Sequence, residues 1–175
     1  MSEFVLAISG RLRAQLARCS SVVELGNGPY GWISGLDQSR RIAVDLFPPY
    51  VANVRATNPE IEAVLADVRD WIRAQPSDSL DAVLLMNILE HMEAPDGHDL
   101  IRHSLRVARR RVIVYVPNGW QPQAPEQENP EFGLNPLQAH VSGWTEDDLT
   151  PYGFSIERIP VPSVPAGALL GTWAK

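Results

Sequence analysis

The chain has 175 residues, a length that fits one domain, 1–175, with enough residues to bury a core. Its formal net charge of −6 and isoelectric point near 5.2 argue against nucleic acid or an anionic membrane as the main partner. The lone cysteine, Cys19, cannot form an intramolecular disulfide, and no Cys/His cluster has zinc spacing, so we expect no metal site. The chain shows neither signal-peptide regions at its start nor an apolar run of about 18 residues, so we expect a cytoplasmic protein.

The first predicted element is an amphipathic helix from Phe4 to Cys19. Its apolar residues recur at steps of three and four, as on one helix face: Val5, Ile8, Leu12 and Leu16. We expect this helix, within the segment 1–19, to cover one face of a sheet. A short lid over a bound ligand is the alternative.

A glycine-rich turn follows in the stretch 21–31, SVVELGNGPYG. A short apolar strand leads into Gly26, Gly28 and Gly31, and the residues from Trp32 onward can start a helix. A strand, a glycine turn and a helix N-terminus in this order form a nucleotide-binding corner. Gly26 can adopt backbone angles that other residues avoid, and Gly28 lets a ligand approach the main chain closely.

An acidic residue decides which nucleotide this turn suits. Glu24 lies two positions before Gly26, where a carboxylate repels a pyrophosphate and attracts a cationic amine. The E-x-G-x-G arrangement resembles motif I of class I S-adenosylmethionine-dependent methyltransferases. This resemblance implies that Glu24, Gly26, Asn27 and Gly28 hold the methionine part of the cofactor. The chain departs from the family at the third glycine, because Gly31 comes one residue late.

The next apolar run, 41–46, predicts a buried parallel strand. Asp45 lies near its end, about twenty residues after the first strand, where a carboxylate can accept hydrogen bonds from both ribose hydroxyls. This spacing predicts an adenosine ligand at Asp45 and Leu46, and it is shared by dinucleotide and S-adenosylmethionine sites.

A helix opened by prolines is predicted for 48–58, followed by a third strand over 62–66. In the family that the chain resembles, the acid after this strand accepts a hydrogen bond from the exocyclic amine of adenine. The resemblance therefore places Asp67 and Val68 beside the adenine, and Trp71 can start a short helix.

The fourth strand is predicted for 81–86. The string DAVLLMNILEHM, 81–92, resembles motif IV of the small-molecule branch of these methyltransferases. The resemblance implies that Asn87 and Ile88 contact the cofactor. For Glu90 and His91, helix packing is an equally good interpretation.

A helix over 98–110 and a strand over 112–116 are predicted next, with Arg106, Arg109, Arg110 and Arg111 capping the end of that helix. The polar, proline-containing stretch 119–143 has no periodic apolar face and follows a strand end that faces the cofactor, so we expect a substrate loop. His140 lies near its end and is the candidate general base, and the alternative is a structural hydrogen bond within the loop.

The chain closes with a helix start capped by Thr145 and two strands, 153–159 and 169–174. Gly171 suggests a bulge in the last strand. Alternating strands and helices predict a parallel sheet with right-handed crossovers. The closing strand pair resembles the ending of the Rossmann-like methyltransferase fold, so we expect a three-layer α/β/α sandwich with a seven-stranded, mostly parallel sheet and a reversed last strand.

These features favour an S-adenosylmethionine-dependent methyltransferase acting on a small-molecule acceptor, which is a reaction that needs alignment more than acid–base groups. A non-catalytic or partner-dependent S-adenosylmethionine-binding subunit is the first alternative. An NAD(P)-dependent oxidoreductase is the second, and both Glu24 and the closing strand pair speak against it. Oligomeric state stays open.

Overall fold

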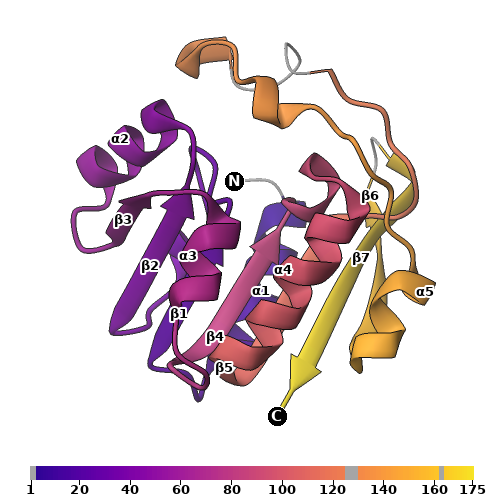
Figure 1. Cartoon of the computed structure of the whole chain (residues 1–175), viewed down its shortest axis with the longest axis horizontal. Coiled ribbons are helices and arrows are strands. Elements are labelled where there is room, and N and C mark those ends of the chain that lie inside the picture. The colour runs from indigo at the N-terminus through magenta and orange to yellow at the C-terminus, as the bar shows by residue number, and fades with distance from the viewer. Residues whose placement is uncertain (1–2, 125–129, 162–163) are drawn as a thin grey trace.

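Seven strands form one sheet in the computed structural model, which describes residues 3–124, 130–161 and 164–175. The strand order across the sheet is β3-β2-β1-β4-β5-β7-β6 (Figure 1). In chain order the strands are β1 Ser21–Leu25, β2 Arg40–Asp45, β3 Glu62–Leu65, β4 Leu80–Met86, β5 Ala108–Pro117, β6 Ser155–Val161 and β7 Val164–Ala174.

The pairing pattern confirms the mostly parallel sheet with a reversed last strand. The pairs β1·β2, β1·β4, β2·β3 and β4·β5 are parallel. β7 lies antiparallel between β5 and β6, so the last strand enters the sheet inside its edge. Strand order reverses at β1, and the crevice beside such a reversal is where open α/β sheets bind ligands.

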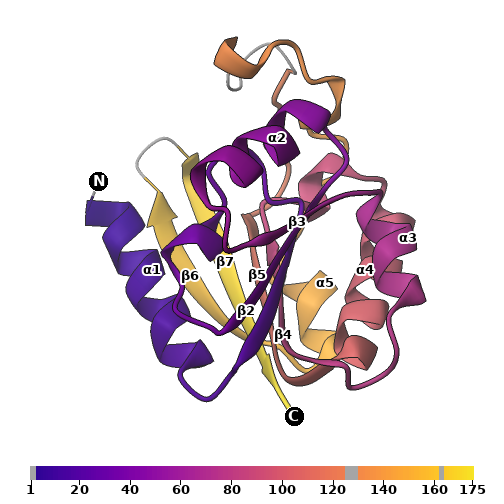
Figure 2. The ribbon, with the colours of Figure 1, turned by 90° about the vertical axis from the view of Figure 1, so that its left-hand side faces the viewer.

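Helices cover both faces, as expected for a three-layer sandwich (Figure 2). On one face lie α1 Glu3–Leu16, the 3₁₀ turn η1 Trp32–Gly35 and α2 Pro48–Thr57. The other face carries α3 Val68–Ala74, α4 Ala94–Val107 and α5 Glu146–Leu149. Short 3₁₀ turns complete the described chain: η2 Leu89–His91, η4 Pro130–Phe132, η5 Pro136–Gln138 and η6 Thr150–Tyr152.

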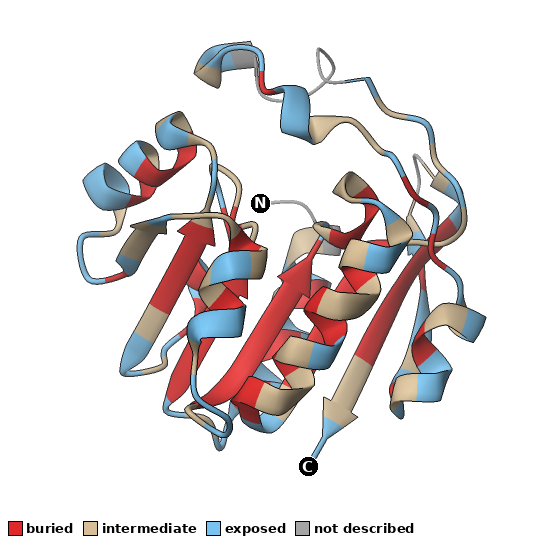
Figure 3. Cartoon of the chain, viewed as in Figure 1, coloured by how far each residue is buried: buried red, intermediate tan, exposed pale blue. Residues whose placement is uncertain are grey.

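A hydrophobic core lies on each face of the sheet, and this explains why the central strands are continuous apolar runs. Every residue of β1 and β4 is buried (Figure 3). Val23 packs toward α3 and α4, whereas its neighbour Val22 packs toward α1. Because successive strand residues point to opposite faces, a strand buried on both sides has to be apolar at nearly every position.

The N-terminal helix covers the sheet as predicted, and it ends at Leu16, three residues earlier than expected. Ile8, Leu12 and Leu16 are buried against β1, β4 and β5. No helix in the described ranges is both long and apolar enough to cross a lipid bilayer.

The helix expected after the glycine turn is absent from the described structure, which corrects one prediction. Residues 32–35 form the single 3₁₀ turn η1. The chain then runs through an irregular stretch and begins β2 at Arg40. The segment between Gly31 and Arg40 is too short to hold several helical turns as well as the return to the start of the sheet.

The arginine cluster also differs from its predicted role. α4 begins at Ala94 and ends at Val107, so Arg109, Arg110 and Arg111 belong to β5. Arg106 donates to the carbonyls of Ile72 and Gln75, at the end of α3. The Nε atoms of Arg109 and Arg110 lie 3.2 and 3.6 Å from Asp81. These cations therefore join neighbouring elements and do not cap their own helix.

Gly171 does not mark a bulge. It pairs in register with Val114 of β5 and with Ile156 of β6. A Cβ atom at Gly171 would lie 3.2 Å from Ile156 and 3.3 Å from Phe154. The glycine is explained by this close packing against its neighbours.

Candidate functional site

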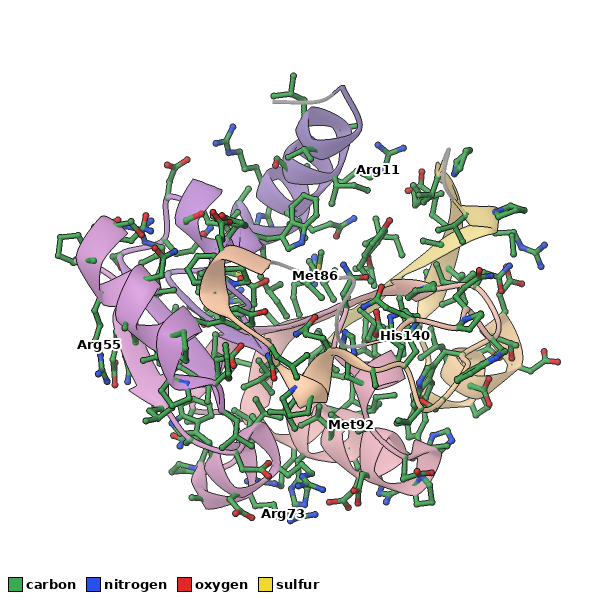
Figure 4. All side chains as sticks on the ribbon, turned by 90° about the horizontal axis from the view of Figure 1, so that it is seen from above. Arg11, Arg55, Arg73, Met86, Met92 and His140 are labelled. Carbon is green, nitrogen blue, oxygen red and sulfur yellow. The ribbon has the colours of Figure 1, made fainter. Side chains whose placement is uncertain are left out.

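A cavity of about 860 Å³ opens at the carboxyl ends of β1, β2, β4 and β5. Seen from above, Met86, Met92 and His140, which line it, lie toward the middle of the molecule, while Arg55 and Arg73 lie at the outer edge (Figure 4). All eleven residues predicted for the site line this one cavity: Glu24, Gly26, Asn27, Gly28, Asp45, Leu46, Asp67, Val68, Asn87, Ile88 and His140.

The glycine turn forms one wall, and its two central glycines have different roles. Both adopt positive φ angles, 70° at Gly26 and 62° at Gly28. A Cβ atom at Gly26 would lie 2.4 Å from Ile88 Cδ1, so this glycine allows close packing. A Cβ atom at Gly28 would meet nothing within 4 Å and would project into open space. Gly28 therefore leaves the main chain accessible to a ligand.

The side chain of Asn27 packs against the glycine turn. Its side-chain amide donates to the carbonyl of Gly28 at 2.7 Å, and its exposure is 6%. A Cβ atom at Gly31 would lie 2.0 Å from the Asn27 Oδ1, so the third glycine makes room for this side chain. Packing against Asn27 therefore explains why the third glycine of the motif stands at position 31.

Glu24, a residue of β1, holds the residues that follow the glycine turn. Its carboxylate is 1% exposed and accepts hydrogen bonds from the main-chain N–H of Ile33 at 2.8 Å and of Trp32 at 3.2 Å. Burial raises the pKa of Glu24 to about 8, although both hydrogen bonds oppose the rise. The sequence predicts an ionised acid facing a cationic amine. In the structure, burial favours the neutral form of Glu24 at pH 7, and its oxygens tie the short turn η1 to β1.

Asp45 joins the end of β2 to the glycine turn. Its Oδ2 accepts from the N–H of Gly28 at 2.8 Å, and its Oδ1 accepts from the N–H of Phe47 at 2.9 Å. Burial raises the pKa of Asp45, and the backbone hydrogen bonds work against the rise. Leu46 follows with 45% of its surface exposed at the cavity. A carboxylate and an exposed apolar side chain thus stand side by side.

Asp67 caps α3 and is held by an arginine. Its Oδ1 accepts from the N–H of Arg69 at 2.9 Å, and its Oδ2 lies 2.6 Å from the guanidinium of the same residue. This guanidinium keeps the pKa of Asp67 below its ordinary value. Arg69 also lies 2.6 Å from Asp96. The acid expected beside an adenine is therefore already oriented, with Val68 buried next to it.

The end of β4 forms the floor. Asn87 has a φ of 52°, a strained value for a residue other than glycine, and its N–H donates to the carbonyl of Tyr115 at 2.7 Å. Such strain is concentrated at functional sites. Ile88 then packs over Gly26, which brings the β4 end against the glycine turn.

Next to the end of β4, η2 contacts the loop that carries His140. The N–H groups of Val141 and Ser142 both donate to the carbonyl of Glu90, at 2.8 and 3.2 Å. The rings of His91 and His140 pack edge to face with centroids 4.9 Å apart. Burial lowers the pKa of His91 to about 4, so this imidazole is neutral at pH 7. Burial, followed by the charge of Glu90, raises the pKa of nearby Tyr115 to about 12.

The substrate loop predicted over 119–143 crosses above the sheet, with 125–129 lying outside the described residues. Phe132 packs its ring against Tyr30 and Tyr50, with centroids 5.8 and 5.5 Å apart. The Tyr30 hydroxyl donates to Glu131. The described part of the loop thus contacts the glycine turn at Tyr30.

Sequence reasoning did not single out the amide side chains that this loop brings to the cavity: Gln121, Gln123, Asn135 and Gln138. It also missed Arg69. Five acidic side chains line the cavity, and Arg69 is the one arginine or lysine among the described lining residues. The unusual amide content of 119–143 was the available signal, but it does not say which amides point inward.

The chain is similar to known proteins in both sequence and fold. Residues 23–116 match a family model described as "Methyltransferase domain". The trans-aconitate 2-methyltransferases of Escherichia coli O7:K1 and Shigella flexneri are each 30% identical over 139 residues, covering 71% of this chain and 53% of the relative. The chain spans about half the length of the curated relatives it matches.

Two solved structures share the fold. One is the 1,6-didemethyltoxoflavin-N1-methyltransferase of Burkholderia thailandensis, with bound 1,6-didemethyltoxoflavin and S-adenosylhomocysteine. It aligns at a TM-score of 0.71 and 21% identity over 99% of this chain and 78% of that chain. The N-methyltransferase NodS of Bradyrhizobium japonicum, in complex with S-adenosylhomocysteine, aligns at 0.70 and 15% identity over 99% of this chain and 88% of that chain.

Proposed function

The chain belongs to the methyltransferase domain family, and on that premise we propose that it transfers a methyl group from S-adenosylmethionine to a small-molecule acceptor. The observation that carries the proposal is the glycine turn held by two acids, the buried Glu24 and the partly buried Asp45. Asp45 accepts from the N–H of Gly28 and Glu24 accepts from the N–H of Ile33, and both acids line the cavity of about 860 Å³. Cavities of roughly 300–1,000 Å³ hold ligands of cofactor size.

The residues present fit this cofactor. Asp45 accepts from Gly28 in the turn and from Phe47 before α2, and it can also accept from ribose hydroxyls, since each carboxylate oxygen has two lone pairs. Leu46 and Val68 offer apolar surface for a purine, and Asp67 offers an acceptor for its amine. Glu24, Asn27, Asn87 and Ile88 complete the wall and floor. We assign the cofactor to these side chains.

When bound, S-adenosylmethionine supplies a methyl group already activated on a sulfonium, so the protein mainly aligns the two reactants and excludes water. His140 is the proposed base for an acceptor that has to lose a proton. Its Nδ1 donates to the carbonyl of Gln121 at 2.5 Å, which leaves Nε2 as the proton-accepting atom.

The charges of the lining indicate the class of acceptor. A polycarboxylate such as trans-aconitate requires several cations, and the described lining offers Arg69, which already contacts Asp67 and Asp96. The amides of Gln121, Gln123 and Gln138 instead suit an uncharged polar compound. We therefore propose a neutral phenol, amine or heteroaromatic N–H compound as acceptor.

Titration calorimetry with S-adenosylhomocysteine, with NAD⁺ run in parallel, tests the cofactor. We expect micromolar binding of S-adenosylhomocysteine and none of NAD⁺. Binding of NAD⁺ alone contradicts the proposal. Transfer of labelled methyl to a panel of small phenols, amines and heteroaromatic compounds, with trans-aconitate as the anionic comparator, tests the acceptor. Preferred methylation of trans-aconitate contradicts the proposed acceptor class.

A further inference from the structure

Three side chains with metal-binding atoms gather at the cavity wall. Glu90 and His91 come from η2, and His140 comes from the loop between β5 and α5. One ligand atom of each can be chosen so that all three lie within 4.8 Å of one another. Glu90 is 2% exposed, so its carboxyl group is held inside the protein at the cavity wall.

The loop is fixed to η2 by hydrogen bonds of the residues that follow His140. Its neighbour Val141 donates to the carbonyl of Glu90 at 2.8 Å. The Ser142 hydroxyl donates to the carbonyl of Leu89 at 3.1 Å, and Trp144 Nε1 donates to that hydroxyl at 2.9 Å. The position of His140 against His91 therefore follows from main-chain anchoring as well as from ring packing.

Both imidazoles are oriented through the same ring atom. His91 Nδ1 donates to the carbonyl of Ala139 at 3.2 Å, and His140 Nδ1 donates to the carbonyl of Gln121 at 2.5 Å. A carbonyl oxygen can only accept, so Nδ1 carries the hydrogen and Nε2 keeps its lone pair in each neutral ring. Metal-binding histidines are held in this way, with one ring N–H donated to a carbonyl and the other nitrogen on the ion.

We propose that Glu90, His91 and His140 bind one divalent cation of the zinc type, through a carboxylate oxygen and two Nε2 atoms. Two histidines, one glutamate and an open position are a ligand set of catalytic zinc sites. At zinc–ligand bonds of about 2.0–2.1 Å, tetrahedral ligands lie about 3.3 Å apart, so small side-chain rotations close the cluster onto the ion. All three residues line the cavity.

The role of the cation in methyl transfer rests on the proposed function. A cation here adds positive charge to a lining rich in carboxylates and binds an acceptor oxygen. A coordinated hydroxyl loses its proton to solvent more readily, an oxygen lone pair then forms the bond to the methyl carbon, and the carbon–sulfur electron pair stays on sulfur. His140 coordinates the ion through the same Nε2 that otherwise accepts a proton, so the cation replaces His140 as the activating group.

Calorimetric titration of the metal-free protein with ZnCl₂ tests the site, and Co²⁺ with its visible absorption bands is the second probe. We expect one Zn²⁺ per chain, weaker Mg²⁺ binding because Mg²⁺ prefers oxygen ligands, and intense tetrahedral-type Co²⁺ bands. His140→Gln should weaken Zn²⁺ binding more than about tenfold. His103→Gln is the matched control, since His103 lies on α4 beside Asp99 and should leave Zn²⁺ binding unchanged.

Folding of each variant is checked by its thermal unfolding and by its affinity for S-adenosylhomocysteine. If Glu90→Gln and His140→Gln fold and bind Zn²⁺ as tightly as the parent protein, the site is overturned. Absence of Zn²⁺ binding at submillimolar concentration overturns it too. If the protein binds S-adenosylhomocysteine but does not bind Zn²⁺, the metal site is wrong and the proposed function stands. If it binds Zn²⁺ at these residues but does not bind S-adenosylhomocysteine, the metal site stands and the proposed function is wrong.

Discussion

The carboxylate of Asp45 accepts a hydrogen bond from the main-chain N–H of Gly28 at 2.8 Å, linking the end of β2 to the glycine turn after β1. The same carboxylate accepts from Phe47 at the start of α2. One side chain thus fixes two of the loops that border the cavity. The shape of the turn depends on an acid that lies on another strand.

Replacement of Asp45 by alanine should weaken binding of S-adenosylhomocysteine by roughly 1–3 kcal/mol, the effect of losing hydrogen bonds to a charged acceptor. Asp45→Asn keeps an acceptor and should lose less. Calorimetry measures both, and Asp37→Ala, which removes an exposed acid elsewhere, is the control. Unchanged affinity in Asp45→Ala excludes Asp45 as the ribose ligand.

Gly28→Val should abolish measurable cofactor binding, because the new side chain enters the open space that Gly28 faces. Its positive φ also costs about 1–2 kcal/mol of stability for a residue with a Cβ. Gly119→Val carries the same type of strain, at a φ of 77°, with open space and outside the cavity lining. Chemical unfolding and calorimetry should show equal destabilisation but binding lost in Gly28→Val only. Micromolar binding by Gly28→Val excludes the assigned turn.

Cofactor binding should release close to one proton per chain at pH 7. Glu24 has a pKa of about 8 and is mainly protonated there, and an incoming ammonium group favours its ionised form. Affinity should therefore rise with pH and level off above about pH 8. Calorimetry in buffers of different ionisation enthalpy counts the protons. Glu24→Gln should abolish the release, and an equal release in that variant assigns the proton to another group.

Gly97→Ala should destabilise the protein by about 1–3 kcal/mol through overpacking. A Cβ atom at Gly97 would lie 2.3 Å from the ring of Trp144, which is 1% exposed. Gly10→Ala, on the exposed side of α1 with nothing within 4 Å, should instead stabilise by about 0.5–1 kcal/mol because alanine favours helices. Urea unfolding measures both, and a gain in each variant refutes the close packing of α4 on Trp144.

The strands and the place of the site could be predicted because they depend on local sequence. β1 and β4 are buried on both faces and therefore read as continuous apolar runs. The carboxyl ends of parallel strands meet at one edge of a sheet, so residues at or just after these ends, such as Gly28, Asp45 and Asn87, necessarily come together. The family resemblance supplied the expected roles of these residues.

Other features depend on contacts that the sequence does not display. The turn η1 replaces the expected helix, and its amides are bound by Glu24 from within the sheet. α4 begins at Ala94, before the predicted start at residue 98, because Pro95 suits the first turn of a helix. His91 and His140 meet because a loop without periodicity returns across the cavity. Its course is set by main-chain hydrogen bonds, which any residue type can make.

The position of β7 between β5 and β6 has a consequence for how the chain is assembled. During synthesis β5 and β6 emerge first, and the strand that joins them, Val164–Ala174, emerges after both. Until then the main-chain groups of β5 on that side have no sheet partner. An unpaired strand edge can join another chain. Nascent or truncated chains that lack residues 164–174 should therefore be the ones that aggregate or recruit chaperones.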